Sequence, residues 1–378
     1  QTYMPPGGTE GRGYQLGTLG KIAHIKFTSE KVGELLDDLK PYQEQLDPDS
    51  DDARLIKVTR REYEKSTRVT AQWVEEFAKE TTIGHQVWEE ARAENNFEKF
   101  QPVLERIYEL RREYSAFFAP YDHVYDPVLD DFQPGLKTAD VIQIFESIRP
   151  KQVALIQAIS EKPQVDDSFL KQPFDEGKQW DFGVDILTAF GYDWNRGRQD
   201  RAAHPFTQSI GIDDVRITTR FSPDELNPAL FASMHEAGHA LYELGIDHAL
   251  ARSPLATGTS LAMHESQSRM YENLLGRSMP FWEFYYSRLQ DVFPSQLGEV
   301  GLTDFYKAIN KVEPSLIRVE ADEATYNLHI MLRLELEIAL MEGSLDVRNL
   351  PEAWNAKVGE FLGLTPPNDA DGVLQDVH

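Results

Sequence analysis

Apolar and polar positions recur along most of this chain with the period of an α-helix. Apolar residues lie three and four positions apart with charged residues between them, a spacing that predicts amphipathic helices. The predicted helices cover residues 20–39, 52–80, 97–118, 138–161 and 327–342. Turn-forming segments separate them at residues 5–8, 47–49, 132–135 and 368–369. The pattern therefore predicts a mainly α fold.

One segment has the pattern of a β-strand instead. Residues 215–220 read Val-Arg-Ile-Thr-Thr-Arg, which alternates and is rich in β-branched side chains. The segment ends just before another helical pattern. We expect a short strand beside that helix, where it could hold an extended peptide by strand addition.

The helix after this strand is predicted to run from Ser222 to Gly245. Ser222 has the side chain of an N-cap, Pro223 suits the first helical position, and Glu225 completes a capping box. Apolar residues then recur at helical spacing as far as Tyr242. Gly245 is a typical C-terminal stop.

This helix carries the sequence His-Glu-Ala-Gly-His at residues 235–239. Residues four apart lie on one helix face, so His235 and His239 could place both imidazoles on one divalent metal ion. Glu236 could reach a metal-activated water molecule and act as its general base. A metalloprotease requires two neutral nitrogen ligands, an open coordination position and a carboxylate that accepts a proton.

A second helical pattern, which opens near Ser260, offers a third ligand. Glu265 on this helix would complete a set of two histidines and one glutamate, leaving the fourth position open. The alternative is that Glu265 is an ordinary solvated acid. His264 points about 100° away from Glu265 on a helix, so we do not count it as a ligand.

Composition narrows the class of protein. The chain has 378 residues, of which 41% are hydrophobic and 27% charged, as in globular proteins with a substantial core. Its 38 basic and 63 acidic side chains give a net charge of -25, which argues against nucleic-acid binding. The absence of cysteine excludes disulfides and thiolate ligands. Cysteine-poor chains are typical of the cytoplasm, which is the compartment that we expect. No apolar run is long enough to cross a membrane and no signal-peptide pattern is present, so we expect no membrane partner.

Six short segments, in this order, resemble the motifs of the carboxypeptidase Taq family of HExxH metallocarboxypeptidases. They are His-Pro-Phe at 204–206, Asp-Val-Arg-Ile-Thr at 214–218, the HExxH at 235–239, His-Glu-Ser-Gln at 264–267, Ile-Arg-Val-Glu-Ala-Asp at 317–322 and Gly-Val-Leu-Gln-Asp-Val-His at 372–378. The likeness begins at residues 2–8 and reaches the last residue. Because the family pattern extends beyond both ends, we expect a truncated chain that lacks the C-terminal part of the family domain.

The resemblance implies a large helical zinc-peptidase fold, similar to gluzincins, with a deep substrate groove and a short β element near the metal site. We expect a single peptidase domain over residues 1–378, with a helical N-terminal lobe (1–200) and a metal-binding lobe (201–378). The resemblance also implies a homodimer and one divalent ion, zinc or cobalt, held by His235, His239 and Glu265. These ligand types discriminate poorly between the two ions.

Members of the family remove single residues from peptide C-termini, so the resemblance implies peptide substrates with a free C-terminus and Glu236 as general base. Such an enzyme must bind the terminal carboxylate, for which arginine is well suited. Arg318 and Arg216 lie in the family's motifs and are our candidates, although each could instead form a structural ion pair. His204 would line the substrate end of the groove or donate to the scissile carbonyl; equally, it could be a core histidine.

Two alternative functions are compatible with the same residues. An oligopeptidase or dipeptidyl carboxypeptidase of related fold would share the ligand pattern. A catalytically inactive peptide-binding fragment would fit the expected truncation, although the intact HExxH and Glu265 argue against it.

Overall fold

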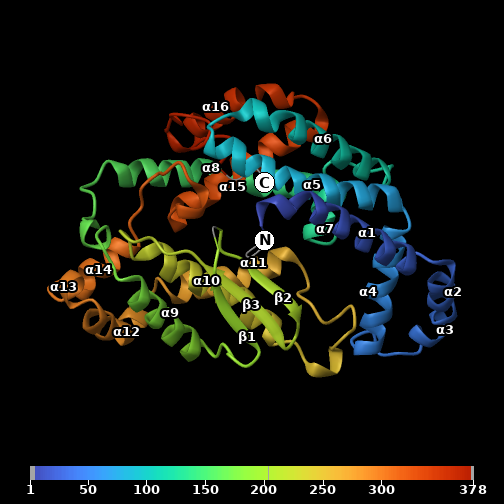
Figure 1. Ribbon diagram of the computed structural model, residues 1–378, viewed down its shortest axis with the longest axis horizontal. Coiled ribbons are helices and arrows are strands. Elements are labelled where there is room, and N and C mark those ends of the chain that lie inside the picture. The colour runs from blue at the N-terminus through green and yellow to red at the C-terminus, as the bar shows by residue number, and fades with distance from the viewer. Residues whose placement is uncertain (1–4, 203, 376–378) are drawn as a thin grey trace. The chain divides into compact units, whose positions relative to one another are not determined.

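The computed structural model of the chain describes residues 5–202 and 204–375. Most of these residues are helical and one small sheet is present (Figure 1), so the predicted mainly α class is confirmed. Contacts divide the described residues into two units. The first, which we call the helical unit, contains the residues up to Ile156 and those from Pro314 onward; the second, the sheet unit, is Gln157–Glu313. The division into lobes at residue 200, and the groove between them, stay predictions.

The helical unit is built from long helices packed in pairs, with α1 against α5, α5 against α6, and α15 against α16. Its helices are α1 (Thr9–Phe27), α2 (Glu30–Asp38), α3 (Lys40–Gln43), α4 (Asp51–Ser66), α5 (Ala71–Ala93), α6 (Phe97–Ala116), α7 (Asp126–Phe132), α8 (Thr138–Ser160, whose last residues fall in the sheet unit), α15 (Glu323–Glu342) and α16 (Leu350–Leu362), with single 3-10 turns η1 (Pro6–Gly8), η5 (Arg318–Glu320) and η6 (Val347–Asn349). Trp73, Leu110 and Tyr114 form one buried cluster between α5 and α6. The Trp73 indole donates to the Leu110 carbonyl at 2.9 Å, so this large side chain is buried with its polar atom satisfied.

The predicted helices agree with the structure in type but not always in extent. The ranges 97–118 and 138–161 correspond to α6 and α8 to within two residues. The ranges 20–39 and 52–80 are each divided, because α1 ends at Phe27 and α4 ends at Ser66. At the second break the Thr70 hydroxyl accepts from the Trp73 N–H at 3.2 Å. This N-cap begins α5, whereas the apolar pattern alone predicted a single helix over residues 52–80.

The sheet unit contains three strands in the order β1-β3-β2, with β1 parallel and β2 antiparallel to the central strand. Their bounds are β1 (Gly197–Arg201), β2 (Thr207–Gly211) and β3 (Asp214–Thr219). The predicted strand at 215–220 is confirmed as β3. The two outer strands were not predicted, because Gly-Arg-Gln-Asp-Arg and Thr-Gln-Ser-Ile-Gly are polar and mostly lack β-branched residues.

The sheet unit also contains the helices that surround these strands. They are η2 (Ser168–Leu170), α9 (Glu176–Phe190), α10 (Asn227–Leu244), η3 (His248–Leu250), α11 (Leu261–Arg269), the π-helical turn η4 (Met270–Leu275), α12 (Met279–Val292), α13 (Pro294–Leu297) and α14 (Leu302–Ile309). Helix α10 packs against β3, β2, α9, α11 and η4 (Figure 1). Its apolar face belongs to a large core that includes Met234, Ile217, Trp282 and Phe305. The HExxH helix is therefore the central helix of this unit.

Helix α10 begins five residues later than the position proposed for the N-cap, so the predicted start was wrong. The helix starts at Asn227, with Pro228 in its first turn, whereas Ser222 forms a β-bridge with Glu225. A helix starting near Pro223 would place Pro228 in its interior, where proline lacks the N–H for the helical hydrogen bond and its ring clashes with the preceding turn. The predicted end at Gly245 is confirmed as the C-cap.

Among the described residues, no helix has both the length and the apolar character that crossing a membrane requires. This agrees with the absence of a long apolar run in the sequence.

Gly238 allows α10 and α11 to touch through their backbones. A Cβ atom added at Gly238 would lie 2.6 Å from the Ser268 Cα and 2.7 Å from the Gln267 carbonyl oxygen. Both are backbone atoms of α11 and cannot move aside as a side chain would. Only glycine therefore fits at this crossing.

We predict that Gly238→Ala lowers the free energy of unfolding by about 1–3 kcal/mol, because the added methyl group overpacks the helix crossing. Gly183→Ala is the matched control, since Gly183 lies inside α9 and, apart from its chain neighbours and the backbone of its own helix, no atom lies within 4 Å of its added Cβ. Replacing that glycine is expected to stabilise the protein by about 0.5–1 kcal/mol. Urea denaturation measures both values, and equal effects at the two positions would contradict the account of the crossing.

Candidate metal centre

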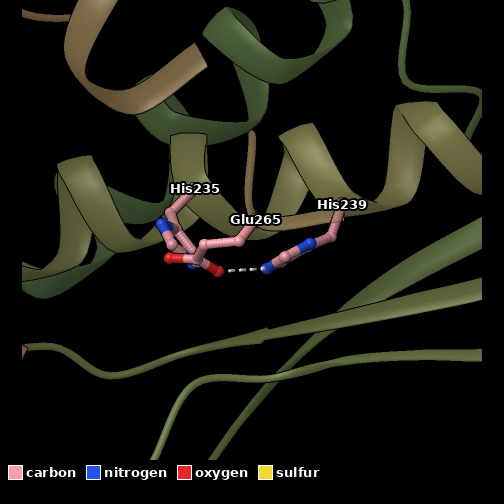
Figure 2. Close-up of side chains that lie close together, drawn as sticks. All are labelled: His235, His239 and Glu265. Atoms are coloured by element: carbon pink, nitrogen blue, oxygen red, sulfur yellow. Dashed lines mark ion pairs between the residues drawn. The ribbon is translucent and has the colours of Figure 1, made fainter. Parts of the chain in front are cut away.

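Three side chains from two consecutive helices point toward one another (Figure 2). His235 and His239 come from α10 and Glu265 comes from α11. The Glu265 Oε2 lies 3.7 Å from the Nε2 of His235 and 3.5 Å from the Nε2 of His239. Within residues 5–202 and 204–375, this is the one group of three potential metal-ligating side chains whose ligand atoms all lie within 4.8 Å of one another.

These distances suit a small divalent ion. Four ligands arranged tetrahedrally at about 2.0–2.1 Å from a zinc ion lie roughly 3.3 Å from each other. The separations of 3.5 and 3.7 Å are close to that value. Two imidazole nitrogens and one carboxylate oxygen are also the donor set of zinc hydrolases that keep one position open. The residues present therefore fit such an ion.

Glu265 is held as a carboxylate by its neighbours. Burial alone would raise its pKa, but the neighbouring His239, His235 and Arg269 side chains outweigh that effect and hold the pKa well below its usual value. The Arg269 Nε donates to the Glu265 Oε1 at 2.9 Å. The Oε2 atom is thereby left facing the two histidines.

Glu272 fixes the other side of the His235 ring. Its Oε2 lies 2.8 Å from the His235 Nδ1 and accepts from the Arg269 Nη1 at 3.2 Å. Burial works against ionisation of Glu272, but the hydrogen bond with His235 outweighs it and the pKa of the carboxyl is lowered. A carboxylate can only accept, so Nδ1 carries the proton and the Nε2 lone pair faces Glu265.

The sequence pattern did not single out Glu272 as a site residue. It lies in the π-helical turn η4, which continues directly from α11. Its position seven residues after Glu265, about two helical turns along the same face, was the one available signal. That signal is weak in a chain with 63 acidic residues.

His239 is held by a different kind of partner. Its Nδ1 lies 3.1 Å from the Nδ1 of His264, and the His264 Nε2 lies 2.6 Å from the Glu243 Oε1. His264 is not part of the converging group and contacts His239 on the ring nitrogen that does not face Glu265.

Glu236 is buried and hydrogen-bonded from the sheet. It is 6% exposed, and its Oε2 accepts from the Thr207 hydroxyl at 2.6 Å. Thr207 is the first residue of β2, so the outer strand fixes the carboxylate of the HExxH glutamate. The sequence gives no local signal for this contact, because the two residues are 29 positions apart.

The structure places two of the predicted substrate-binding residues near β2 and β3. Arg216 projects from the exposed side of β3, and its Nε and Nη2 donate to the two carboxylate oxygens of Asp214 at 2.7 and 2.8 Å. This hydrogen-bonded pair raises the pKa of Arg216. His204 is exposed before β2, with its Nδ1 2.8 Å from the Pro205 carbonyl oxygen. Their proposed roles with substrate stay predictions.

Arg318 belongs to the helical unit. Its backbone N–H donates to the Gln375 Oε1 at 2.9 Å, and its Nη1 donates to the Tyr326 hydroxyl at 2.7 Å. The Gln375 Oε1 also accepts from the Arg333 Nη2 at 2.9 Å. Two of the sequence motifs, 317–322 and 372–378, thus meet through Gln375. Residues 376–378 of that motif, and residues 2–4 of the opening segment, lie outside the described residues.

Comparison with known proteins shows that the chain is similar to metallocarboxypeptidases. Residues 1–378 match the family model described as carboxypeptidase Taq (M32) metallopeptidase. The chain is 41% identical to thermostable carboxypeptidase 1 of Thermus thermophilus over 100% of this chain and 76% of that protein. It is 37% identical to carboxypeptidase 1 of Bacillus subtilis over 100% of this chain and 75% of that protein.

Solved structures agree with the sequence comparison. An M32 carboxypeptidase from Deinococcus radiodurans R1 superposes with a TM-score of 0.91 at 40% identity, covering 100% of this chain and 75% of that one. A Pyrococcus furiosus carboxypeptidase superposes with a TM-score of 0.90 at 34% identity, covering 100% of this chain and 76% of that one. The predicted resemblance and fold class are confirmed.

The electrostatics of His235 predict how metal affinity depends on pH. Burial lowers the pKa of this imidazole, but the hydrogen bond and charge of Glu272 outweigh it, and the pKa is raised above 6.5. A metal ion needs the neutral ring, so below the raised pKa each bound ion displaces a proton. Affinity is expected to fall about tenfold per pH unit there and to level off above it.

Competition with a chelator of known pH dependence, measured from about pH 8.5 down to about pH 6, tests this expectation around the ordinary histidine range. A metal affinity that stays constant across that range would show that His235 loses no proton on binding.

Proposed function

The chain belongs to the carboxypeptidase Taq (M32) metallopeptidase family, and we propose on this basis that it hydrolyses the last peptide bond of peptides with a free C-terminus, using one divalent metal ion. The observation that carries this proposal is the convergence of His235, His239 and Glu265, with Glu265 Oε2 at 3.7 and 3.5 Å from the two Nε2 atoms. An inactive peptide-binding fragment would have no need to keep these side chains aligned.

The ligands in this proposal are the Nε2 atoms of both histidines and the Oε2 of Glu265. Each is supported by a partner on its other polar atom: Glu272 for His235, His264 for His239 and Arg269 for Glu265. Such outer partners set the ring orientation and the protonation state that ligation needs. We propose zinc or cobalt as the ion, because this donor set suits both.

A divalent ion held there supplies Lewis acidity, which polarises the scissile carbonyl and makes water easier to deprotonate. Glu236 accepts the proton of the attacking water and then passes it to the leaving amine. The products are a shortened peptide and one free amino acid. The Thr207 hydroxyl, donating to the Glu236 Oε2, keeps this carboxylate in one orientation and leaves Oε1 as the proton acceptor.

Selectivity for the last residue requires a cation that binds the terminal carboxylate. We propose Arg318 for this role, with Arg216 as the second candidate, because both lie in segments that resemble the family's motifs, at 317–322 and 214–218. His204 then lines the substrate end of the site or donates to the scissile carbonyl. These roles rest on the family motifs that the three residues occupy.

We also propose that the protein is a cytoplasmic homodimer. The family resemblance supports the dimer, and the lack of cysteine is compatible with the cytoplasm. On α1, Leu19, Ile22 and Ile25 are 64%, 46% and 52% exposed. Their spacing places them along one side of the helix, and exposed apolar stripes of this kind are typical of protein interfaces.

We predict that Glu236→Gln binds metal as the wild type does but loses turnover by about 10²–10⁴-fold, because the amide has nearly the same shape and cannot accept the proton. Metal content and hydrolysis of a free-acid peptide are measured on the same preparation. Glu283→Gln on the exposed face of α12 is the control and should behave as wild type. Comparable turnover of Glu236→Gln and wild type would refute the general-base role.

A pair of peptides with the same sequence separates a carboxypeptidase from an oligopeptidase. The free-acid peptide should lose one residue at a time, whereas the peptide with a C-terminal amide should stay intact, because the terminal carboxylate is required for binding. Mass spectrometry identifies the products. Internal cleavage of the amide peptide would favour an oligopeptidase, and release of dipeptides from the free acid would favour a dipeptidyl carboxypeptidase.

A further inference from the structure

Beside His239 lies a pair of residues, His264 and Glu243, of which the mechanism above uses only the contact between His264 and His239. The Nδ1 atoms of His239 and His264 are 3.1 Å apart, and the His264 Nε2 is 2.6 Å from the Glu243 Oε1. Glu243 is only 3% exposed. A glutamate this deeply buried is unusual and needs a partner that favours its charged form.

The surrounding loop fixes this pair in place. The Gly258 N–H donates to the same Glu243 Oε1 at 2.9 Å. A Cβ atom at Gly258 would lie 2.4 Å from the His264 Cδ2 and 2.7 Å from its Nε2, so glycine is needed for the loop to approach the ring. The Tyr242 ring meets the His264 ring edge-on, with 5.0 Å between centroids. His264 is thus confined by the loop and by α10.

When the His264 ring is neutral, its two hydrogen-bond partners specify where each proton lies. Glu243 accepts two N–H groups on one oxygen, an arrangement that favours its carboxylate form. A carboxylate accepts only, so His264 must carry its proton on Nε2, and in a neutral ring its Nδ1 is then an acceptor. The Nδ1 of His239 must donate to it. His239 is left with a lone pair on Nε2, the atom that lies 3.5 Å from the Glu265 Oε2.

We propose that Glu243 and His264 are positioning residues that lock His239 in the tautomer able to bind the metal, and so strengthen metal retention. This inference rests on the proposed function, since it requires His239 to be a ligand. His235 is held by a carboxylate directly, through Glu272, whereas His239 is held by a carboxylate through an intervening imidazole. Loss of outer hydrogen bonds of this kind typically weakens metal binding by about 10–100-fold.

Two substitutions of His264 separate its two hydrogen bonds. His264→Asn places an amide oxygen near the position of Nδ1, where it can still accept from His239, but it does not reach Glu243. His264→Gln places its amide nitrogen near the position of Nε2, where it can still donate to Glu243, but it offers His239 no acceptor. Each variant breaks one buried hydrogen bond, so the two should lower the thermal midpoint of the metal-free protein to a similar extent.

The measurement is the zinc dissociation constant of the full chain, determined by competition with a chelator. We expect His264→Gln to bind zinc about 10–100-fold more weakly than wild type, and His264→Asn to remain within a fewfold of wild type. Gly258→Ala provides an independent variant that keeps every polar group and displaces the ring. It should also weaken zinc binding.

The outcomes distinguish this inference from the proposed function. If the wild-type protein does not bind zinc in a 1:1 ratio, the proposed metal centre is wrong and the inference fails with it. If wild type binds zinc and His264→Gln binds it equally well, the metal centre stands and the positioning role is refuted. Equal losses of zinc affinity in the Gln and Asn variants would also refute it, because a general loss of packing would then explain both.

Discussion

The candidate site depends on the close contact between α10 and α11 at Gly238. This glycine lies between the two histidines of the HExxH, and the backbone at Gln267 and Ser268 fills the space where its Cβ would be. Glu265 lies two residues before Gln267 on α11 and reaches the histidines from there. A larger residue at 238 would push α11 outward and carry the third carboxylate with it. The metal-binding geometry is therefore a consequence of helix packing.

A second constraint is that each of the three converging side chains uses both of its polar atoms. One ring nitrogen or carboxylate oxygen faces the proposed metal position, and the other is hydrogen-bonded to a fixed partner. Arg269 contributes twice, since it donates to both Glu265 and Glu272. Arg277 lies over the Phe231 ring, with its guanidinium carbon 3.8 Å from the ring centroid. Its Nη2 atom lies 3.8 Å from the Glu272 Oε1. These cations allow several carboxylates to remain ionised close together in a partly buried site.

The sequence was sufficient to predict the parts of the site that depend on local periodicity. The spacing of His235 and His239, and the helical pattern around Glu265, follow from contacts within one or two helices. The family assignment from ordered motifs is confirmed as well. The start of α10 could have been predicted correctly by giving more weight to Pro228, whose missing N–H is tolerated only in a first turn.

The rest of the site depends on contacts between residues distant in sequence. Thr207 reaches Glu236, and Glu272 reaches His235, across 29 and 37 positions. Strands β1 and β2 are too polar to be recognised and form because β3 lies between them. The contacts of His264 could not be predicted for a related reason. Helical geometry correctly placed its side chain away from Glu265, but could not show that it would contact His239 and Glu243.

The proposed chemistry requires His235, His239 and Glu265 to hold a single divalent ion. Anomalous X-ray scattering from crystals of the metal-loaded protein, recorded at the zinc and cobalt absorption edges, tests it most directly. We expect one strong peak about 2.0–2.2 Å from the two Nε2 atoms and the Glu265 carboxylate, and the edge at which it appears identifies the ion. A peak bound elsewhere, or none at this position in metal-loaded crystals, would show that these three side chains do not form the metal site.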